Sequence, residues 1–87
     1  RRVSFGAVPD FEHQGPGVKL SGVSPGSPAE QAGMRAGDIV FELGGKAVGS
    51  LAEFSSVLRS LSPGQVVDVV FSHDGTERKA QVTVVER

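Results

Sequence analysis

The stretch SPAEQAGMRAGDIVFELGGKAV, residues 27–48, carries the signals from which the fold can be worked out. It opens with the start of a helix, because Ser27 can act as the N-cap and Glu30 completes a capping box. Pro28 suits the first helical position, where its missing N–H costs nothing. Gly33 is expected to end this helix after little more than two turns. The stretch therefore predicts a short, capped helix.

Strands are predicted on both sides of that helix. Residues 38–43 place a large apolar residue at every second position, which is typical of a strand with one buried face. The residues expected on that face are Ile39, Phe41 and Leu43. Residues 44–45 are both glycine and predict a turn, and residues 47–48 predict a very short strand. Residues 17–23 predict another strand before the helix.

A second and longer helix is predicted by SLAEFSSVLRSLSPG, residues 50–64. Ser50 can cap it, and Glu53 again completes a capping box. Apolar residues recur at helical spacing, and they are Leu51, Phe54, Leu58 and Leu61. Ser62-Pro63-Gly64 ends the pattern, as expected where a helix stops.

Two further strands, residues 65–72 and 77–85, end the sequence. The Asp74-Gly75 pair between them is a strong hairpin signal. The complete order is two strands, a short helix, two strands, a longer helix and two strands. This order suits a partly open barrel or sandwich of antiparallel strands closed by two helices.

Composition limits the classes of partner. The chain has 87 residues, enough for one small domain with a modest core. Its net charge is −1 and no basic block exceeds two residues, so we expect no nucleic-acid partner. No apolar run approaches the roughly 20 residues that a membrane span needs, so no membrane partner is expected either. With no cysteine, disulfides and thiolate metal sites are excluded.

The segments SPAEQAG, AGDIVFELGGKAV and SLAEFSSVL, followed by a hairpin with an Asp-Gly turn, together resemble a PDZ domain. The resemblance covers nearly the whole chain and implies a single domain over residues 1–87. It implies an α+β, mostly β fold: a partly open antiparallel barrel or sandwich of five to six strands with two helices. The strand order resembles the circularly permuted bacterial form, in which the strand that opens an animal-type domain comes last, here residues 80–85.

Two groups of bacterial enzymes carry modules that this chain resembles. HtrA-type proteases contain permuted PDZ domains, and the N-terminal part of the chain is similar to PDZ modules of secreted zinc aminopeptidases. The resemblance implies a non-catalytic peptide-binding module, monomeric and without a cofactor. It also implies an accessory role beside a catalytic peptidase domain of the same chain, in the bacterial cell envelope or outside the cell.

The stretch SFGAVPDF, residues 4–11, would form one wall of the peptide site. PDZ domains bind an extended peptide as an added strand, and a loop of the pattern x-φ-G-φ holds the peptide's terminal carboxylate. By resemblance, the N–H groups of residues 5–7 would form a nest for this anion, and Arg2 would add positive charge. The residues expected in this wall are Ser4, Phe5, Gly6, Ala7 and Val8.

The longer helix would form the other wall. Leu51, Ser55 and Leu58 lie on one helical face at i, i+4 and i+7. With Phe5 and Ala7 they would line an apolar slot, so the last ligand residue is expected to be hydrophobic. Leu51 and Leu58 could equally be core residues, and Gly6 could merely permit a bend of the backbone.

Pro9 leaves the function open between two hypotheses. It stands where PDZ domains donate a backbone N–H to the ligand, and proline has none. Proline also guards sheet edges against pairing. The chain could therefore bind only the last one or two ligand residues. Alternatively, it is a structural packing module of a protease, with a groove that is closed or filled by the parent chain itself.

No set of catalytic or metal-binding residues is evident. His13 and His73 are isolated in the sequence and lack metal-ligand spacing. His73 and Asp74 fall in a predicted turn, where both are expected to be solvated. The serines have no nucleophile-elbow context. We therefore expect no catalytic residue and no metal in this chain.

Overall fold

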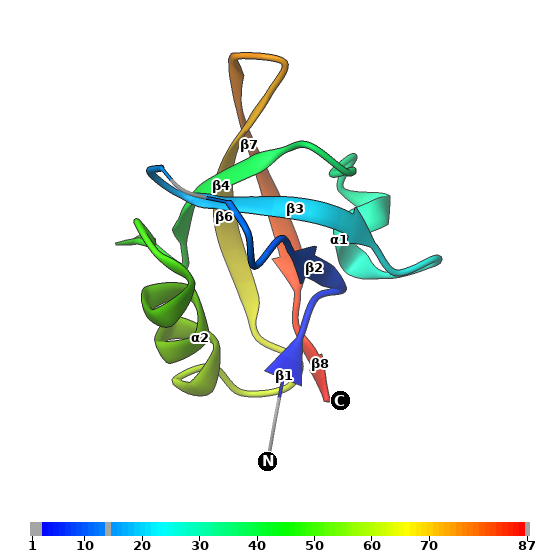
Figure 1. The fold of residues 1–87 in the computed structure, drawn as a ribbon. Coiled ribbons are helices and arrows are strands. Elements are labelled where there is room, and N and C mark those ends of the chain that lie inside the picture. Colours follow the sequence, from blue (N-terminus) through cyan, green and yellow to red (C-terminus); the bar gives the residue numbers. More distant parts are fainter. Residues whose placement is uncertain (1–2, 14, 87) are drawn as a thin grey trace.

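The computed structural model describes residues 3–13 and 15–86 (Figure 1). Two helices and eight strands are present in this part of the chain. In chain order they are β1 Val3–Ser4, β2 Ala7–Pro9, β3 Val18–Val23, α1 Pro28–Gln31, β4 Ile39–Leu43, β5 Lys46–Ala47, α2 Leu51–Arg59, β6 Val66–His73, β7 Thr76–Thr83 and β8 Val85–Glu86.

The strands form two antiparallel sheets. Five strands of the larger sheet follow the order β2-β3-β4-β6-β7, and β5 pairs with β4. The strands β1 and β8 form a separate two-stranded sheet, with Val3 opposite Glu86. In Figure 1, α2 lies to the left of the strands and α1 to the right. The mostly β architecture with two helices confirms the fold predicted from the sequence.

Both helices begin as predicted. The Ser27 hydroxyl accepts from Glu30 N–H (3.2 Å), and the Ser50 hydroxyl accepts from Glu53 N–H (3.3 Å). Each glutamate also accepts from the N–H of the glycine before the cap, one residue earlier than the partner in a standard capping box. Within the described residues, neither helix has the length and apolar character to cross a membrane.

α1 is shorter than predicted. It covers only Pro28–Gln31, and Ala32 is its C-cap. Gly33, at φ +90°, donates its N–H to Glu30 O, which tightens the last turn and takes the chain out of the helix. The glycine signal was therefore correct, but the helix ends before it.

The core lies between the large sheet and the two helices. Phe5 packs edge-to-face on Phe54 of α2, with ring centroids 6.0 Å apart and an interplanar angle of 62°. This contact attaches the N-terminal segment to α2. The other buried apolar residues are Val3, Val18, Leu20, Ala29, Met34, Val40, Leu43, Val48, Val57, Val67, Val69, Phe71, Val82 and Val84.

The predicted buried face of β4 was partly wrong. Val40 and Leu43 are fully buried, whereas Ile39 and Phe41 are only half-buried. The pairing of β4 with β6 shifts register between Val40 and Glu42. This bulge inserts one residue, so the inward side changes from even to odd positions along the strand. Simple alternation cannot detect such a change.

The two predicted glycine turns are both present. Leu43 pairs with Lys46 across Gly44-Gly45, and His73 pairs with Thr76 across Asp74-Gly75. All four loop residues have positive φ, between 50° and 82°. Two consecutive positive φ values define the turn type that matches the twist of a two-residue hairpin.

Candidate functional site

The loop that leads into β2 directs its backbone donors to one side. Phe5 O accepts from Ala29 N–H and Gly6 O accepts from Ser24 N–H, both at 2.8 Å. These two carbonyls therefore point into the domain. In a trans peptide the N–H of the next residue points the opposite way, so the N–H groups of Gly6 and Ala7 point outward. Gly6 makes this course possible with φ +90°.

One of these donors already has a partner inside the chain. Gly6 N–H donates to Ser4 Oγ at 3.0 Å. The hydroxyl rotates freely and both accepts and donates. Ser4 therefore provides an acceptor for the Gly6 N–H when no external acceptor is present.

The strand β2 forms one end of the larger sheet. Gly6 O is bonded to Ser24 N–H, and bonded and non-bonded pairs alternate along an antiparallel ladder. Ala7, which lies opposite Val23, is therefore in a non-bonded pair, and its N–H and C=O point away from β3. Ala7 thus presents both backbone groups at the outer edge of β2.

Pro9 occupies the next outward-pointing position on β2. Asp10 N–H donates to Lys19 O (2.8 Å), which places Pro9, opposite Leu20, in a non-bonded pair. A register shift between Val8 and Pro9 leaves Ser21 as an extra residue on β3. Pro9 therefore offers a carbonyl but no N–H to this edge.

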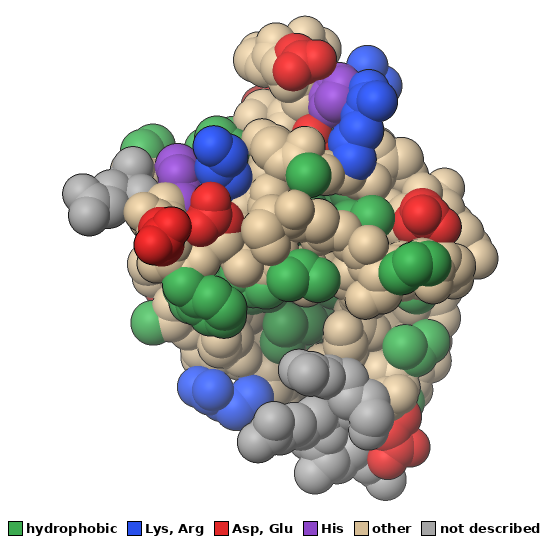
Figure 2. Space-filling model, turned by 45° about the vertical axis from the view of Figure 1, so that its right-hand side comes forward, with side chains coloured by type: hydrophobic (Ala, Val, Ile, Leu, Met, Phe, Trp, Pro, Cys, Tyr) green, Lys and Arg blue, Asp and Glu red, His purple; other side chains and the backbone are tan. Residues whose placement is uncertain are grey.

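The predicted face of α2 is intermediate between core and surface. Leu51, Ser55 and Leu58 are half-buried, whereas Phe54 and Val57 are buried. The two leucines pack against the core with their inner sides. A partly covered apolar face of this kind is what a groove wall requires. Figure 2 shows hydrophobic side chains gathered across the middle of one face, with charged side chains around them.

Not every predicted site residue lies where a ligand side chain could contact it. The Phe5 side chain is 1% exposed and belongs to the core. Val8 is 42% exposed, but strand alternation directs its side chain to the face opposite Ala7. Phe5 and Val8 could thus contribute backbone or support but little side-chain contact. Arg2 lies outside the described residues.

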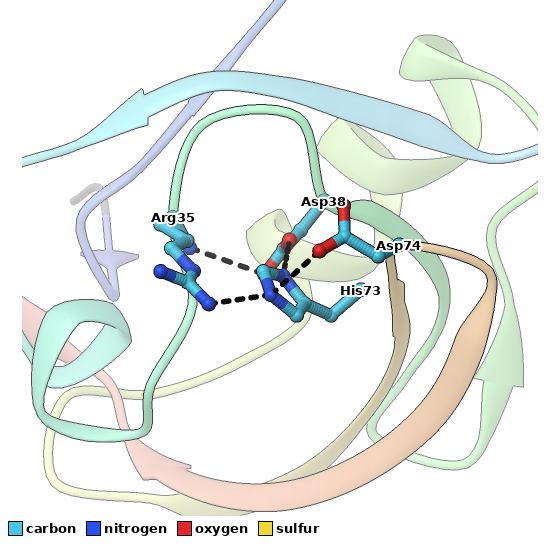
Figure 3. A network of polar contacts seen from close by, with 4 residues as sticks. All are labelled: Arg35, Asp38, His73 and Asp74. Carbon is cyan, nitrogen blue, oxygen red and sulfur yellow. Dashed lines mark hydrogen bonds and ion pairs between the residues drawn. The ribbon is translucent and has the colours of Figure 1, made fainter.

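A separate polar cluster joins β6 to the turn before β4 (Figure 3). His73 Nδ1 lies 2.6 Å from Oδ1 of Asp38, which is 1% exposed, and Arg35 N–H donates to Asp38 Oδ2 at 3.1 Å. The Arg35 guanidinium lies 2.5 Å from His73 Nε2. The same Nε2 lies 3.3 Å from Oδ2 of Asp74, so this nitrogen faces both a group that only donates and a group that only accepts.

The expectation of a solvated His73 was wrong. Its side chain is 14% exposed, since β6 continues through His73 and the turn begins at Asp74, whose side chain is 90% exposed. An Asp–His pair could in principle activate a nucleophile. Here the nitrogen that would do so is already in contact with the Arg35 guanidinium and with Asp74 Oδ2.

Comparison with known sequences identifies relatives among bacterial proteases. The family model described as PDZ domain matches residues 9–84. The zinc metalloprotease RasP of Oceanobacillus iheyensis is 34% identical over 75% of the chain, and the periplasmic pH-dependent serine endoprotease DegQ of Escherichia coli is 37% identical over 78%. The chain spans only 15% of the length of each of these relatives.

Solved structures show the same fold. The HtrA-type protease AlgW, solved with a decapeptide, superposes over 99% of the chain and 30% of its own, with a TM-score of 0.87 and 18% identity. An aminopeptidase N family protein from Idiomarina loihiensis covers 98% of the chain and 14% of its own, with a TM-score of 0.83 and 22% identity. On the match of the family model over most of its length, this chain belongs to the PDZ domain family.

Proposed function

We propose that this chain is a peptide-binding module that recognises hydrophobic C-termini by strand addition. The peptide would lie between the outer edge of β2 and the half-buried face of α2. Its terminal carboxylate would accept from the N–H groups of the Gly6 loop, and its main chain would pair with Ala7. Arg2 would add positive charge near the carboxylate.

The observation that carries this proposal is the orientation of the Gly6 and Ala7 amides. Both carbonyls before them are bonded inside the domain. The two N–H groups therefore both point to the outer side, where consecutive donors can bind an anion as backbone nests do, once Gly6 N–H exchanges its bond to Ser4 Oγ for the ligand. Ala7 continues this pattern into an edge where a strand can be added.

The apolar residues beside this edge support a hydrophobic last ligand residue. Leu51 and Leu58 are partly exposed on α2, and Ala7 is small and half-buried. Ser55, between the leucines, is small as well and leaves room for a medium-sized or large side chain. Burying one such side chain contributes about 1.5–3 kcal/mol.

We also propose that residues 1–87 form one domain that acts as a monomeric accessory module of a bacterial peptidase. The named relatives include a zinc metalloprotease and a periplasmic serine endoprotease. Their names favour a place in the cell envelope or outside the cell. Catalysis would then belong to another part of the parent protein.

The test is a titration of the isolated chain, followed by amide chemical shifts. Short peptides with a free hydrophobic C-terminus should produce saturable shifts at Gly6, Ala7, Ser55 and Leu58. The same peptides with an amidated C-terminus should lose most of this effect. Equal binding of free and amidated peptides would contradict carboxylate recognition.

Two neighbouring serines provide a matched pair of variants. Ser55→Trp fills the groove from its half-buried position on α2, whereas Ser56→Trp adds the same ring at an exposed position. Peptide binding should be lost in the first and retained in the second. Circular dichroism would check that both variants fold. Retained binding in a folded Ser55→Trp would place the peptide elsewhere.

Pro9 favours a second candidate, a packing module whose groove binds no free peptide. The absence of an N–H at this outward position weakens β2 as a template for a long strand. In this case, the titration would give no shifts at millimolar peptide. Occupation by the parent chain would then appear as protection of the same amides in the full-length protein.

A further inference from the structure

A small hollow lies beyond the end of β2, next to the start of α2. Its volume is about 140 Å³, and it is lined by the loop after β2, the first residues of β3 and residues 49–51. Leu51 lines this hollow and also belongs to the proposed groove, so the two lie next to each other. Phe11 stands at the hollow with 77% of its surface exposed, more than the other exposed large hydrophobic residues of the described chain.

The walls of the hollow are held by backbone bonds. Gly17 N–H donates to Gly49 O (3.2 Å) across it, and Asp10 N–H donates to Lys19 O (2.8 Å). A Cβ at Gly17 would lie 2.6 Å from Ile39 Cγ2, so the loop can pass this close only with glycine. The hollow is thus a consequence of how the loop packs on β4.

Several polar groups around the hollow are already bonded inside the chain. The Ser50 hydroxyl accepts from Glu53 N–H, and Asp10 Oδ1 accepts from Glu12 N–H. His13 Nε2 lies 3.5 Å from Pro16 O. The apolar part of the wall is the ring of Phe11 together with the side chains of Leu51 and Val18, next to the polar side chains of Asp10, His13 and Lys19.

The position of the hollow relative to β2 selects one ligand residue. In antiparallel addition the last ligand residue lies beside Ala7, and the residue two before it lies beside Pro9. Alternate residues of a strand point to the same face. The residue four before the last thus faces the same side as the last. Because β2 ends at Pro9, this residue would extend past the strand toward the loop that carries Phe11.

We propose that this hollow binds an aromatic side chain four residues before the C-terminus of the bound peptide, an inference that rests on the proposed function. A closed apolar cavity of about 150 Å³ binds benzene. This hollow is open to solvent and has both polar and apolar walls, and its volume of about 140 Å³ leaves room for one ring against Phe11 and Leu51. Phe11 would meet this ring in an edge-to-face or offset arrangement. The side-chain contact would offset the backbone bond that Pro9 cannot make.

The test compares matched peptides with the same hydrophobic C-terminus. The residue four before the last is Phe, Leu, Lys or Ala, and a second set moves Phe one residue in each direction. Phe at the fourth position should bind about threefold to tenfold more tightly than Ala, given the usual strength of an aromatic pair. It should also produce ring-current shifts at the amides of Gly17 and Gly49.

Two alanine variants separate the hollow from general surface effects. Phe11→Ala should remove the advantage of the Phe peptide and leave the affinity of the Ala peptide unchanged. Val66→Ala, which removes another exposed apolar side chain on β6, should keep that advantage. Circular dichroism checks that both variants fold.

Three results would overturn the inference while the proposed function stands. They are equal affinity for the Phe and Ala peptides, a preference for Leu or Lys over Phe, and a Phe preference that persists in Phe11→Ala. Failure of the Ala peptide to bind at all would instead reject the proposed function, and the inference with it.

Discussion

His73 Nδ1 lies 2.6 Å from Asp38 Oδ1 and joins two residues that are 35 positions apart. The contact fixes the tip of β6 to the turn that leads into β4. Asp38 is 1% exposed, so its carboxylate depends on partners inside the chain.

Removal of His73 should therefore destabilise the fold. His73→Ala leaves Asp38 with the Arg35 N–H as its remaining described partner, and an underpaired buried group costs about 1–3 kcal/mol in the free energy of unfolding. Urea denaturation would measure the loss. His13→Ala, in the loop after β2, should change the free energy of unfolding by no more than roughly 0.5 kcal/mol. Similar losses in the two variants would show that the pair contributes little.

The close approach of Gly6 to Ser27 predicts a second stability effect. A Cβ at Gly6 would lie 2.2 Å from Ser27 Cβ, whereas a Cβ at Gly33 would meet no atom within 4 Å. Both glycines have φ +90°. Gly33→Ala should cost about 1–2 kcal/mol from backbone strain, and Gly6→Ala should cost about 1–3 kcal/mol more because Ser27 must move.

Thermal or urea unfolding of these two variants would separate strain from steric conflict. Equal losses in the free energy of unfolding would mean that Ser27 can move away from the new Cβ without destabilising the fold. The contact also makes any larger side chain at Gly6 a poor probe of peptide binding, because it would disturb the cap of α1 at the same time.

Restoration of the missing donor at Pro9 should strengthen peptide binding. Pro9→Ala supplies an N–H at the outward position opposite Leu20. One added hydrogen bond contributes about 1 kcal/mol, or about fivefold in affinity. The gain should appear for peptides of four or more residues and be absent for dipeptides. Pro63→Ala, in the loop after α2, is the control. It should leave the affinity for the longer peptides and for the dipeptides unchanged.

The bond between Ser4 Oγ and Gly6 N–H predicts an effect that depends on the ligand carboxylate. Ser4→Ala removes this internal acceptor and leaves the donor for the ligand. Affinity for free-acid peptides should rise about twofold to fivefold, with no change for amidated peptides, in isothermal calorimetry. Ser62→Ala is the control. A weaker free-acid complex in Ser4→Ala would instead indicate that the hydroxyl contacts the ligand.

Local signals predicted most of the elements. The caps Ser27 and Ser50 and the Asp74-Gly75 hairpin depend on neighbouring residues, so the sequence displays them directly. The half-buried face of α2 also followed from helical spacing. These features need no knowledge of where distant segments lie.

Features set by distant contacts could not be predicted in the same way. The bulge in β4 depends on its pairing with β6, and the burial of His73 depends on Asp38, which lies far away in sequence. The hollow beside Phe11 forms only where the loop after β2 meets the start of α2. In each case the deciding partner belongs to another element, and residue type alone does not identify it.

The pairing of β1 with β8 has a mechanical consequence. Val3 lies opposite Glu86, so the two ends of the described chain come together at one corner of the molecule (Figure 1). Tension applied through polypeptide attached at both ends would load this short pair first and separate it like a zipper, one bond at a time. The six-stranded sheet behind it would bear no force until that pair had opened.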